Sequence, residues 1–159
     1  MDPALFEEVA AILPGLVPEE LGPVRQRARR YGIKVWFGPP SKPIREHYEA
    51  QVIGAADVPE ARILALEVGF HAEHTKEAEN EAVLAALMAK ERAWRKIVGR
   101  EPVAGEFIGA AAHWRRISET WPDPDLGERG LAFEIAARLT DYVTGLEPVR
   151  RARTPAAAG

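Results

Sequence analysis

The stretch "ALEVGFHAEH", residues 65–74, carries the pattern that decides the fold. Its apolar side chains occupy every second position, at Leu66, Val68, Phe70 and Ala72. The positions between them hold Glu67, Gly69, His71 and Glu73. A period of two residues is typical of a β-strand that buries one face in a core. The sequence therefore predicts a half-buried strand whose second face is polar and contains a histidine between two carboxylates.

Two preceding segments repeat this alternation. "YGIKVWFG", residues 31–38, sets Lys34 and Trp36 against an apolar side, and "REHYEAQVIG", residues 45–54, sets His47, Glu49 and Gln51 against another. The connections are short, and short connections join antiparallel neighbours. We therefore expect a three-stranded meander with its apolar face towards helices.

Helical periodicity dominates the remaining segments. A first helix is expected from the Asp2-Pro3 cap to Pro14-Gly15, and a second short one over 17–32, with Arg25, Arg27, Arg29 and Arg30 near its end. A long helix is expected from Thr75 to Gly99, and a last one from about Gly127 to Thr144. "HWRRISETW", residues 113–121, alternates as a further strand, and "GEFIG", residues 105–109, either pairs with it or forms a loop.

These segments predict an α+β fold with a mainly antiparallel sheet of four to five strands, N-terminal helices, and two longer helices packed on one face. Apolar residues make up 47% and charged residues 28% of the 159 residues, as in an ordinary globular protein. We expect a single domain over residues 1–148 and a flexible tail over residues 149–159, which lack periodicity.

Composition narrows the classes of function. The chain has no cysteine, which excludes disulfides and Cys-ligated metal centres and agrees with a cytoplasmic location. Its formal net charge of −3 does not favour nucleic acid as a partner. No segment resembles a signal peptide or a membrane span, so no membrane association is expected.

The polar faces of residues 45–54 and 65–74 meet if these strands form a hairpin. A turn centred on Asp57 and Val58 would set Glu49 opposite Glu67 and His47 opposite Gly69, with His71 diagonal to His47. Imidazole and carboxylate are ligands for zinc, manganese or iron, so His47, His71 and Glu73 could hold a divalent metal while Glu49 or Glu67 acts as general base. Gly69 would leave space for a ligand.

Three interpretations of this face stay open. It is the solvated side of a sheet, a pocket for a small ligand or protein partner with Trp36, Lys34 and Gln51 as contacts, or a metal-dependent enzyme site. A fourth hypothesis is nucleic-acid binding through the arginines at 25, 27, 29 and 30 together with Arg115 and Arg116. The pattern favours an intracellular binding or accessory domain. It fixes neither the ligand nor the oligomeric state.

The order of elements also resembles a known group of domains. The meander, "LEVGFHAEHTKEAENEAVLAALMAKERAWRKIVG", a strand with "WRRIS" and a helix ending "DYVTGLEP" look like small uncharacterised α+β domains found alone or beside restriction-type nuclease domains. The resemblance covers residues 31–148 and implies an accessory role. A restriction-type nuclease would need acidic-x-Lys, but Glu49-Ala50-Gln51 has glutamine at the lysine position, which argues against cleavage by this chain.

Overall fold

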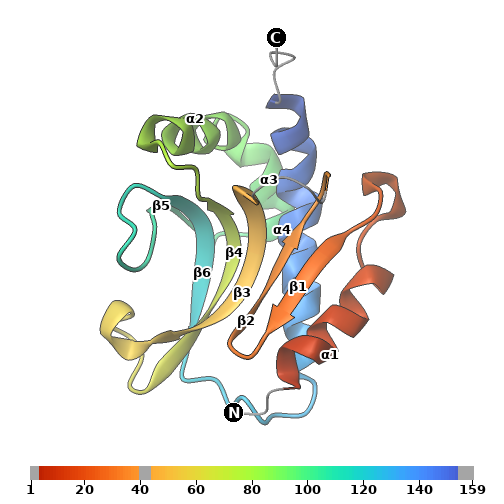
Figure 1. The fold of residues 1–159 in the computed structure, drawn as a ribbon, viewed down its shortest axis with the longest axis vertical. Coiled ribbons are helices and arrows are strands. Elements are labelled where there is room, and N and C mark those ends of the chain that lie inside the picture. The colour runs from red at the N-terminus through yellow and green to blue at the C-terminus, as the bar shows by residue number, and fades with distance from the viewer. Residues whose placement is uncertain (1–3, 40–43, 154–159) are drawn as a thin grey trace.

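A six-stranded antiparallel sheet forms the centre of the computed structural model, which describes residues 4–39 and 44–153. The strands lie in the order β1-β2-β3-β4-β6-β5 (Figure 1). Their bounds are β1 Arg25–Arg29, β2 Gly32–Trp36, β3 Glu46–Gly54, β4 Leu64–Ala72, β5 Val103–Glu106 and β6 Arg115–Pro122. The predicted α+β class and the antiparallel meander of β2, β3 and β4 are confirmed, whereas the predicted count of four to five strands is wrong.

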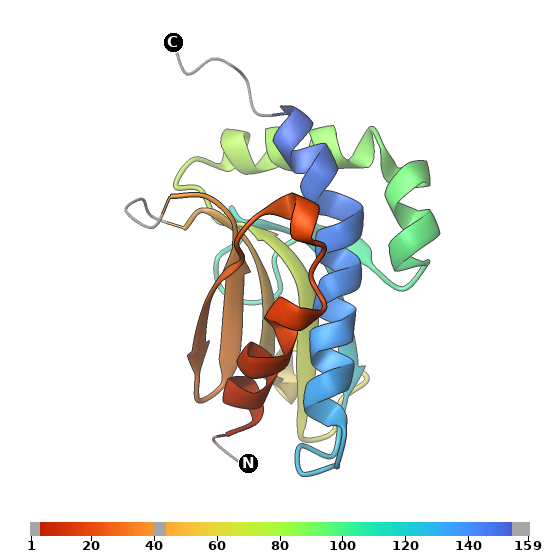
Figure 2. The ribbon, with the colours of Figure 1, turned by 90° about the vertical axis from the view of Figure 1, so that its right-hand side faces the viewer.

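The described chain also contains four α-helices. They are α1 Leu5–Ile12, α2 Glu77–Met88, α3 Glu91–Val98 and α4 Leu131–Arg153. Helices α1 and α4 lie on one face of the sheet (Figure 2), while α2 crosses the upper end of the sheet and α3 packs on α4 (Figure 1). The core fills the space between this face and the helices, with Tyr48, Phe70 and Ile117 fully buried from the sheet side.

Residues 25–29 form an edge strand, so the second predicted helix is wrong. Gln26 turns to the helix side and donates from Nε2 to the carbonyl oxygen of Ala10 at 2.6 Å, and Ala28 packs against the core. The alternating arginines therefore lie on the opposite face of the sheet. A strand fits better than a helix because its period of two separates these two sets completely.

The single helix expected between Thr75 and Gly99 is divided in two. Lys90 leaves the helical region with φ −114° and ψ 20°, and the Trp94 indole donates to the carbonyl oxygen of Leu87 at 2.9 Å. This bend lets Trp94 and Val98 bury themselves against α4 while α2 covers the end of the sheet. The predicted stop at Gly99 is confirmed, with φ +90°.

Helix α4 continues beyond the predicted end near Thr144. Gly145 is a packing residue within it, because an added Cβ would lie 2.9 Å from Cγ2 of Val98 on α3. Residues 149–153 are helical, so the expected tail is wrong for that part, and residues 154–159 lie outside the described chain. The predicted Asp2-Pro3 cap also lies outside it.

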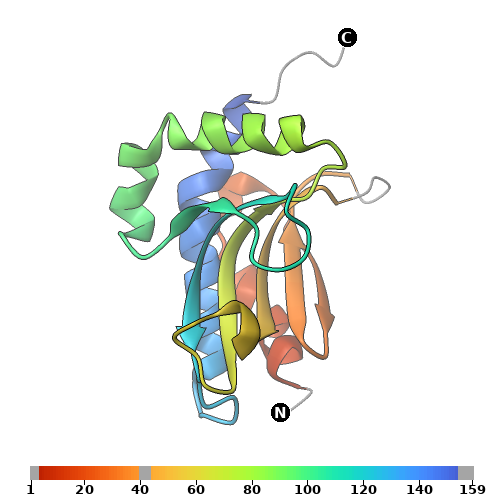
Figure 3. The ribbon, with the colours of Figure 1, turned by 90° about the vertical axis from the view of Figure 1, so that its left-hand side faces the viewer.

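The second face of the sheet is crossed by two connections. In Figure 3 the segment joining β3 to β4 and the segment joining β5 to β6 both lie in front of the strands. The first includes a 3₁₀ turn at Ala55–Asp57. In the part of the chain that the structure describes, no helix combines the length and the apolar character needed to cross a membrane.

Candidate functional site

The strand registers arrange the polar face in rows that cross the sheet. His47 of β3 pairs directly with His71 of β4, and His71 pairs with Arg116 of β6. The next row contains Arg27, Lys34, Glu49, Gly69 and Ser118. The predicted face of each strand is therefore confirmed.

The predicted register of the hairpin is wrong, because each residue of β3 pairs with the residue two positions further along β4 than predicted. Glu49 lies opposite Gly69, and Gln51 rather than Glu49 lies opposite Glu67. The turn centres near Pro59 because the 3₁₀ turn at Ala55–Asp57 shifts the reversal along the chain. This shift puts the two histidines directly opposite each other, with ring centroids 5.5 Å apart and the rings nearly perpendicular.

This polar face is buried, so its interpretation as the solvated side of a sheet is wrong. His47, Glu67 and His71 are at most 1% exposed, and Glu49 and Glu73 are 8% exposed. The Phe107 ring, from the connection between β5 and β6, packs on His71 with centroids 4.9 Å apart. Burial of five ionisable groups is costly unless they pair with one another or bind a cation.

Four of these side chains converge on one point. His47, Glu49, His71 and Glu73 each offer one ligand atom, and all four atoms lie within 4.8 Å of one another. His47 Nε2 is 2.8 Å from Glu49 Oε1 and 3.4 Å from Glu73 Oε2. His71 Nδ1 is 3.3 Å from the same Glu49 oxygen and 3.2 Å from the same Glu73 oxygen. Ligands at about 2.0–2.1 Å from a tetrahedral zinc ion are separated by about 3.4 Å, close to most of these distances.

The two ring nitrogens of His71 have different surroundings. Nε2 lies 2.9 Å from Glu67 Oε2 in a hydrogen bond. Nδ1 is buried between the carboxylates of Glu49 and Glu73 but has no aligned hydrogen bond within the described chain. His47 Nδ1 is likewise buried without a hydrogen-bond partner among the described residues.

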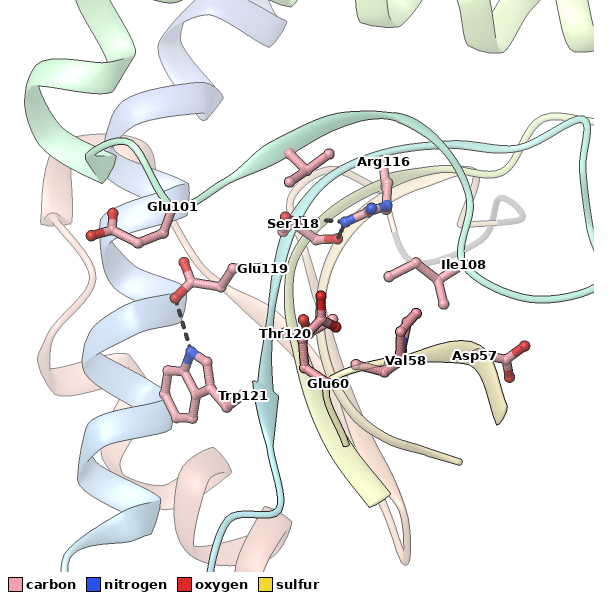
Figure 4. Close-up of a pocket in the computed structure, with 12 residues that line it drawn as sticks. Asp57, Val58, Glu60, Glu101, Ile108, Arg116, Ser118, Glu119, Thr120 and Trp121 are labelled. Atoms are coloured by element: carbon pink, nitrogen blue, oxygen red, sulfur yellow. Dashed lines mark hydrogen bonds between the residues drawn. The ribbon is translucent and has the colours of Figure 1, made fainter. Parts of the chain in front are cut away.

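Glu67 is held from three sides. Its Oε2 accepts hydrogen bonds from the Ser118 hydroxyl at 2.7 Å and from His71, and its Oε1 accepts one from Gln51 Nε2 at 2.8 Å. Arg116 in turn donates from Nη1 to Ser118 Oγ at 3.0 Å (Figure 4). Both oxygens of this fully buried carboxylate are therefore engaged.

The cluster strongly perturbs its own protonation. Burial alone would raise the pKa of the Glu49 carboxyl, but its interactions with His47 and His71 outweigh burial and lower that pKa to about 2. The same balance lowers the pKa of Glu67 and of Glu73. Burial would lower the pKa of His71, yet the surrounding carboxylates, Glu67 first, raise it well above its ordinary value. Positive charge is thus stabilised at the centre of this cluster.

The predicted contact residues lie around the cluster at different distances. Lys34 Nζ is 3.7 Å from Glu73 Oε1, and Gln51 supports Glu67 as described. Trp36 lines a separate hollow of about 240 Å³ with His74 and Arg150, and its indole nitrogen is buried without a hydrogen-bond partner in the described residues. Gly69 leaves no space for a ligand, because an added Cβ would lie 2.3 Å from the carbonyl oxygen of Ile117.

The arginines proposed for nucleic-acid binding do not form one patch. Arg25, Arg27 and Arg29 lie on edge strand β1, whereas Arg115 forms ion pairs with α2, reaching Glu77 Oε1 at 2.8 Å. Strands β2, β3 and β4 separate β1 from β6. The hypothesis that joined both groups therefore lacks a continuous surface.

Two hollows flank the cluster. One of about 440 Å³ lies against β6 and is lined by Arg116, Ser118 and Thr120 together with the β3–β4 connection (Figure 4). The other, of about 300 Å³, lies towards β1 and reaches Glu49 and Gln51.

Sequence reasoning put Arg116 and Ser118 on one face of a strand but missed their place beside the histidines, because alternation does not reveal which strands pair.

Comparison with protein-family models, with curated proteins and with solved structures found no match to this chain. The resemblance to accessory domains beside nucleases therefore stays a prediction. The candidate site rests on its own geometry.

Proposed function

We propose that this protein binds one divalent transition-metal ion, zinc in the first instance, on the buried polar face of its sheet. The ligands are His47 Nε2, His71 Nδ1, Glu49 and Glu73. The observation that carries the proposal is His71 Nδ1, a fully buried nitrogen 3.2–3.3 Å from two carboxylate oxygens with no hydrogen bond to either. A neutral His71 would turn the Nδ1 lone pair towards two carboxylates, which is repulsive unless a proton or a metal ion lies between them.

The donor set favours zinc over the hard cations. Two imidazoles with two carboxylates suit zinc, manganese and iron, whereas calcium and magnesium take oxygen ligands almost alone. Four protein ligands of these types are the usual number for a zinc ion. Glu49 and Glu73, each 8% exposed, are the most exposed of the four proposed ligands.

In this proposal Glu67 positions a ligand and is not a general base. Its hydrogen bond to His71 Nε2 makes Nδ1 the nitrogen that is free to bind metal, which is the usual carboxylate–histidine–metal arrangement. Glu67 contacts His71 at Nε2, across the ring from the proposed metal-binding Nδ1, and both of its oxygens accept hydrogen bonds from protein groups. Glu49, proposed from sequence as the alternative base, serves as a ligand.

The first test is elemental analysis of the purified, untagged protein. We expect about one equivalent of zinc, with a large loss of metal in His71→Ala. The matched control is His113→Ala, because His113 lies outside the ligand set and packs on Trp114. Metal-free wild-type protein that takes up no zinc would contradict the proposal and leave a protonated His71 as the buried cation.

A buried histidine also contributes to folding, so a second variant separates the two effects. Glu73→Gln alters a ligand at the rim of the cluster, where the residue is 8% exposed. We expect a folded protein with weakened zinc binding. Cobalt substitution gives an independent readout, since intense visible bands report tetrahedral coordination. Wild-type bands that persist unchanged in Glu73→Gln would exclude Glu73 as a ligand.

The same face supports the broader proposal of an intracellular binding domain for a small ligand. The 300 Å³ hollow beside Glu49 is the observation that favours a small molecule over a protein partner. Cytoplasmic location stays a prediction from composition.

A further inference from the structure

The hollow towards β1 has an unusual charge. Four cationic side chains line it, Arg27, Arg29, Arg30 and Lys34, and the single carboxylate among its lining residues is Glu49. This leaves a formal excess of three positive charges, four against one. The whole chain has a net charge of −3, so the excess is a local feature of this face.

The three arginines among these cations are not neutralised by neighbouring carboxylates in the described part of the chain. Among the described residues, Arg27, Arg29 and Arg30 form no ion pair; Arg27 and Arg30 instead stack near the rings of Trp36 and Tyr31. All three arginines are exposed. Structural arginines elsewhere in the fold do find carboxylates, as Arg138 does with Glu119 at 2.7 Å. The hollow therefore retains its capacity to attract an anion.

The hollow reaches one of the proposed zinc ligands, Glu49. Arg27, Lys34 and Glu49 are consecutive neighbours in one row across β1, β2 and β3. Lys34 Nζ lies 3.7 Å from Glu73 Oε1, so its charge stands between the hollow and the cluster. Gly32 pairs with Gln51, and both residues line the hollow. Because Gly32 has no side chain, it does not fill this space.

We infer that this hollow binds a small oxyanion, inorganic phosphate or a phosphomonoester, that approaches the metal from the side of Glu49. The inference rests on the proposed zinc site, because zinc neutralises Glu49 and Glu73 and so makes the inner end of the hollow attractive to an anion. Lys34 and Arg27 hold the phosphate oxygens, and Arg29 and Arg30 attract the ligand from the outer end. A volume of about 300 Å³ suits a small molecule.

Isothermal titration with inorganic phosphate at constant ionic strength tests this inference. The protein is loaded with zinc, freed of excess metal, and assayed for zinc content in the same sample. We expect phosphate binding that weakens about tenfold or more in Arg27→Gln and in Lys34→Gln. Arg27→Gln should keep its zinc. Arg92→Gln removes an exposed arginine on α3 and should bind phosphate like the wild type.

The outcomes separate the two proposals. Full zinc content with no phosphate binding, or with binding unchanged in Arg27→Gln, would overturn the anion site and leave the metal site standing. Phosphate binding that is equally strong without zinc would overturn the link to the metal. A wild-type protein that binds neither zinc nor phosphate would refute both proposals.

Two further ligands identify the source of the phosphate. A sugar phosphate that binds more tightly than inorganic phosphate would identify a phosphomonoester as the ligand. A single-stranded oligonucleotide that binds more tightly than either, with a steep dependence on salt, would replace the small-anion site by a nucleic-acid surface on β1.

Discussion

His71 has a carboxylate near each ring nitrogen, and the one at Nε2 determines what the other nitrogen can do. Glu67 accepts a hydrogen bond from His71 Nε2 and is itself held by hydrogen bonds from Ser118 and Gln51. When a metal replaces the proton on Nδ1, a charged acceptor at Nε2 keeps the remaining proton there and makes Nδ1 a stronger metal ligand.

Glu67→Gln should therefore weaken zinc binding by about 10–100-fold without removing a ligand. The measurement is competition against a chromophoric chelator. Glu134→Gln, an exposed glutamate on α4, is the matched control and should leave the affinity unchanged. Equal affinities in wild type and Glu67→Gln would show that Glu67 does not act through His71.

Gly69 is the second residue on this face with a narrow requirement. A Cβ there would lie 2.3 Å from Ile117 O and 2.5 Å from Ser118 Cα, both backbone atoms of β6. Gly69→Ala should lower the free energy of unfolding by about 2–4 kcal/mol in urea titrations, because β4 and β6 must separate. Gly54→Ala has open space and should stay within about 0.5 kcal/mol of the wild type. A similar result for both variants would contradict the close approach of these strands.

At this scale the sequence predicted which side chains share a face but not which ones touch. Alternation fixes the parity of a strand, and parity alone brought His47, Glu49, His71 and Glu73 to one side. The direct pairing of His47 with His71 depends on the turn near Pro59, and the role of Ser118 depends on β6 pairing with β4. Neither the position of the turn nor the pairing of β6 with β4 can be predicted from the sequence pattern of a single strand.

Among the elements, β1, the break between α2 and α3, and the C-terminal part of α4 were predicted wrongly. The arginines of residues 25–30 fit either a helix end or a strand edge, and the contact of Gln26 with Ala10 that selects the strand is non-local. The end of α4 looked like a tail because its apolar spacing fades after Leu146. Its order comes instead from ion pairs made by Arg150 and Arg151 with Glu147.

Glu147 is fully buried, and these arginines carry its counter-charge. Arg150 lies 2.7 Å and Arg151 2.9 Å from its Oε2, and Tyr48 donates to Oε1 at 2.9 Å. Replacing both arginines by glutamine should cost about 2–4 kcal/mol of unfolding free energy in urea titrations. Arg129→Gln, at an exposed position, is the control. Unchanged stability in the double variant would restore the sequence-based expectation that the chain end is dispensable.

The start of β4 is joined to the end of β6 by Asp123. Its carboxylate accepts backbone N–H groups of Arg62 and Ile63 at 2.7 and 2.8 Å, and these hydrogen bonds lower the pKa of Asp123. A lowered pKa in the folded state means that the stabilisation is complete above the unfolded pKa of about 3.9 and is lost as pH falls through the folded value.

Asp123→Asn should therefore be less stable than the wild type at neutral pH, with a difference that shrinks as the solution is acidified below about pH 4. Asparagine is a suitable replacement because it tolerates the left-handed backbone at this position, where φ is +46°. Urea titrations at a series of pH values measure the difference. A gap between the two proteins that is independent of pH would show that the Asp123 charge does not stabilise this junction.

For the molecule as a whole, the proposed ligands belong to one continuous sheet whose opposite face carries the core. His47 and Glu49 come from β3, His71 from β4 and Glu73 from the residue that follows β4, and Tyr48 and Phe70 on the same strands are buried under α4. Unfolding must disperse the ligands, so any metal that binds them is linked to global stability. A ligand specific to the folded state adds RT ln(1 + [L]/Kd) to the free energy of unfolding.

Buffered free zinc at about 100 times its Kd should thus raise the free energy of unfolding by about 2.7 kcal/mol over the metal-free protein. Urea titrations across a zinc series test the slope as well as the size, because each tenfold rise in zinc above Kd adds about 1.4 kcal/mol for one site. His113→Ala should follow the wild-type line, and His71→Ala should show almost no dependence. A flat line for the wild type would mean that the buried charges are balanced by a proton on His71 rather than by a metal. A slope twice as steep would require a second ion.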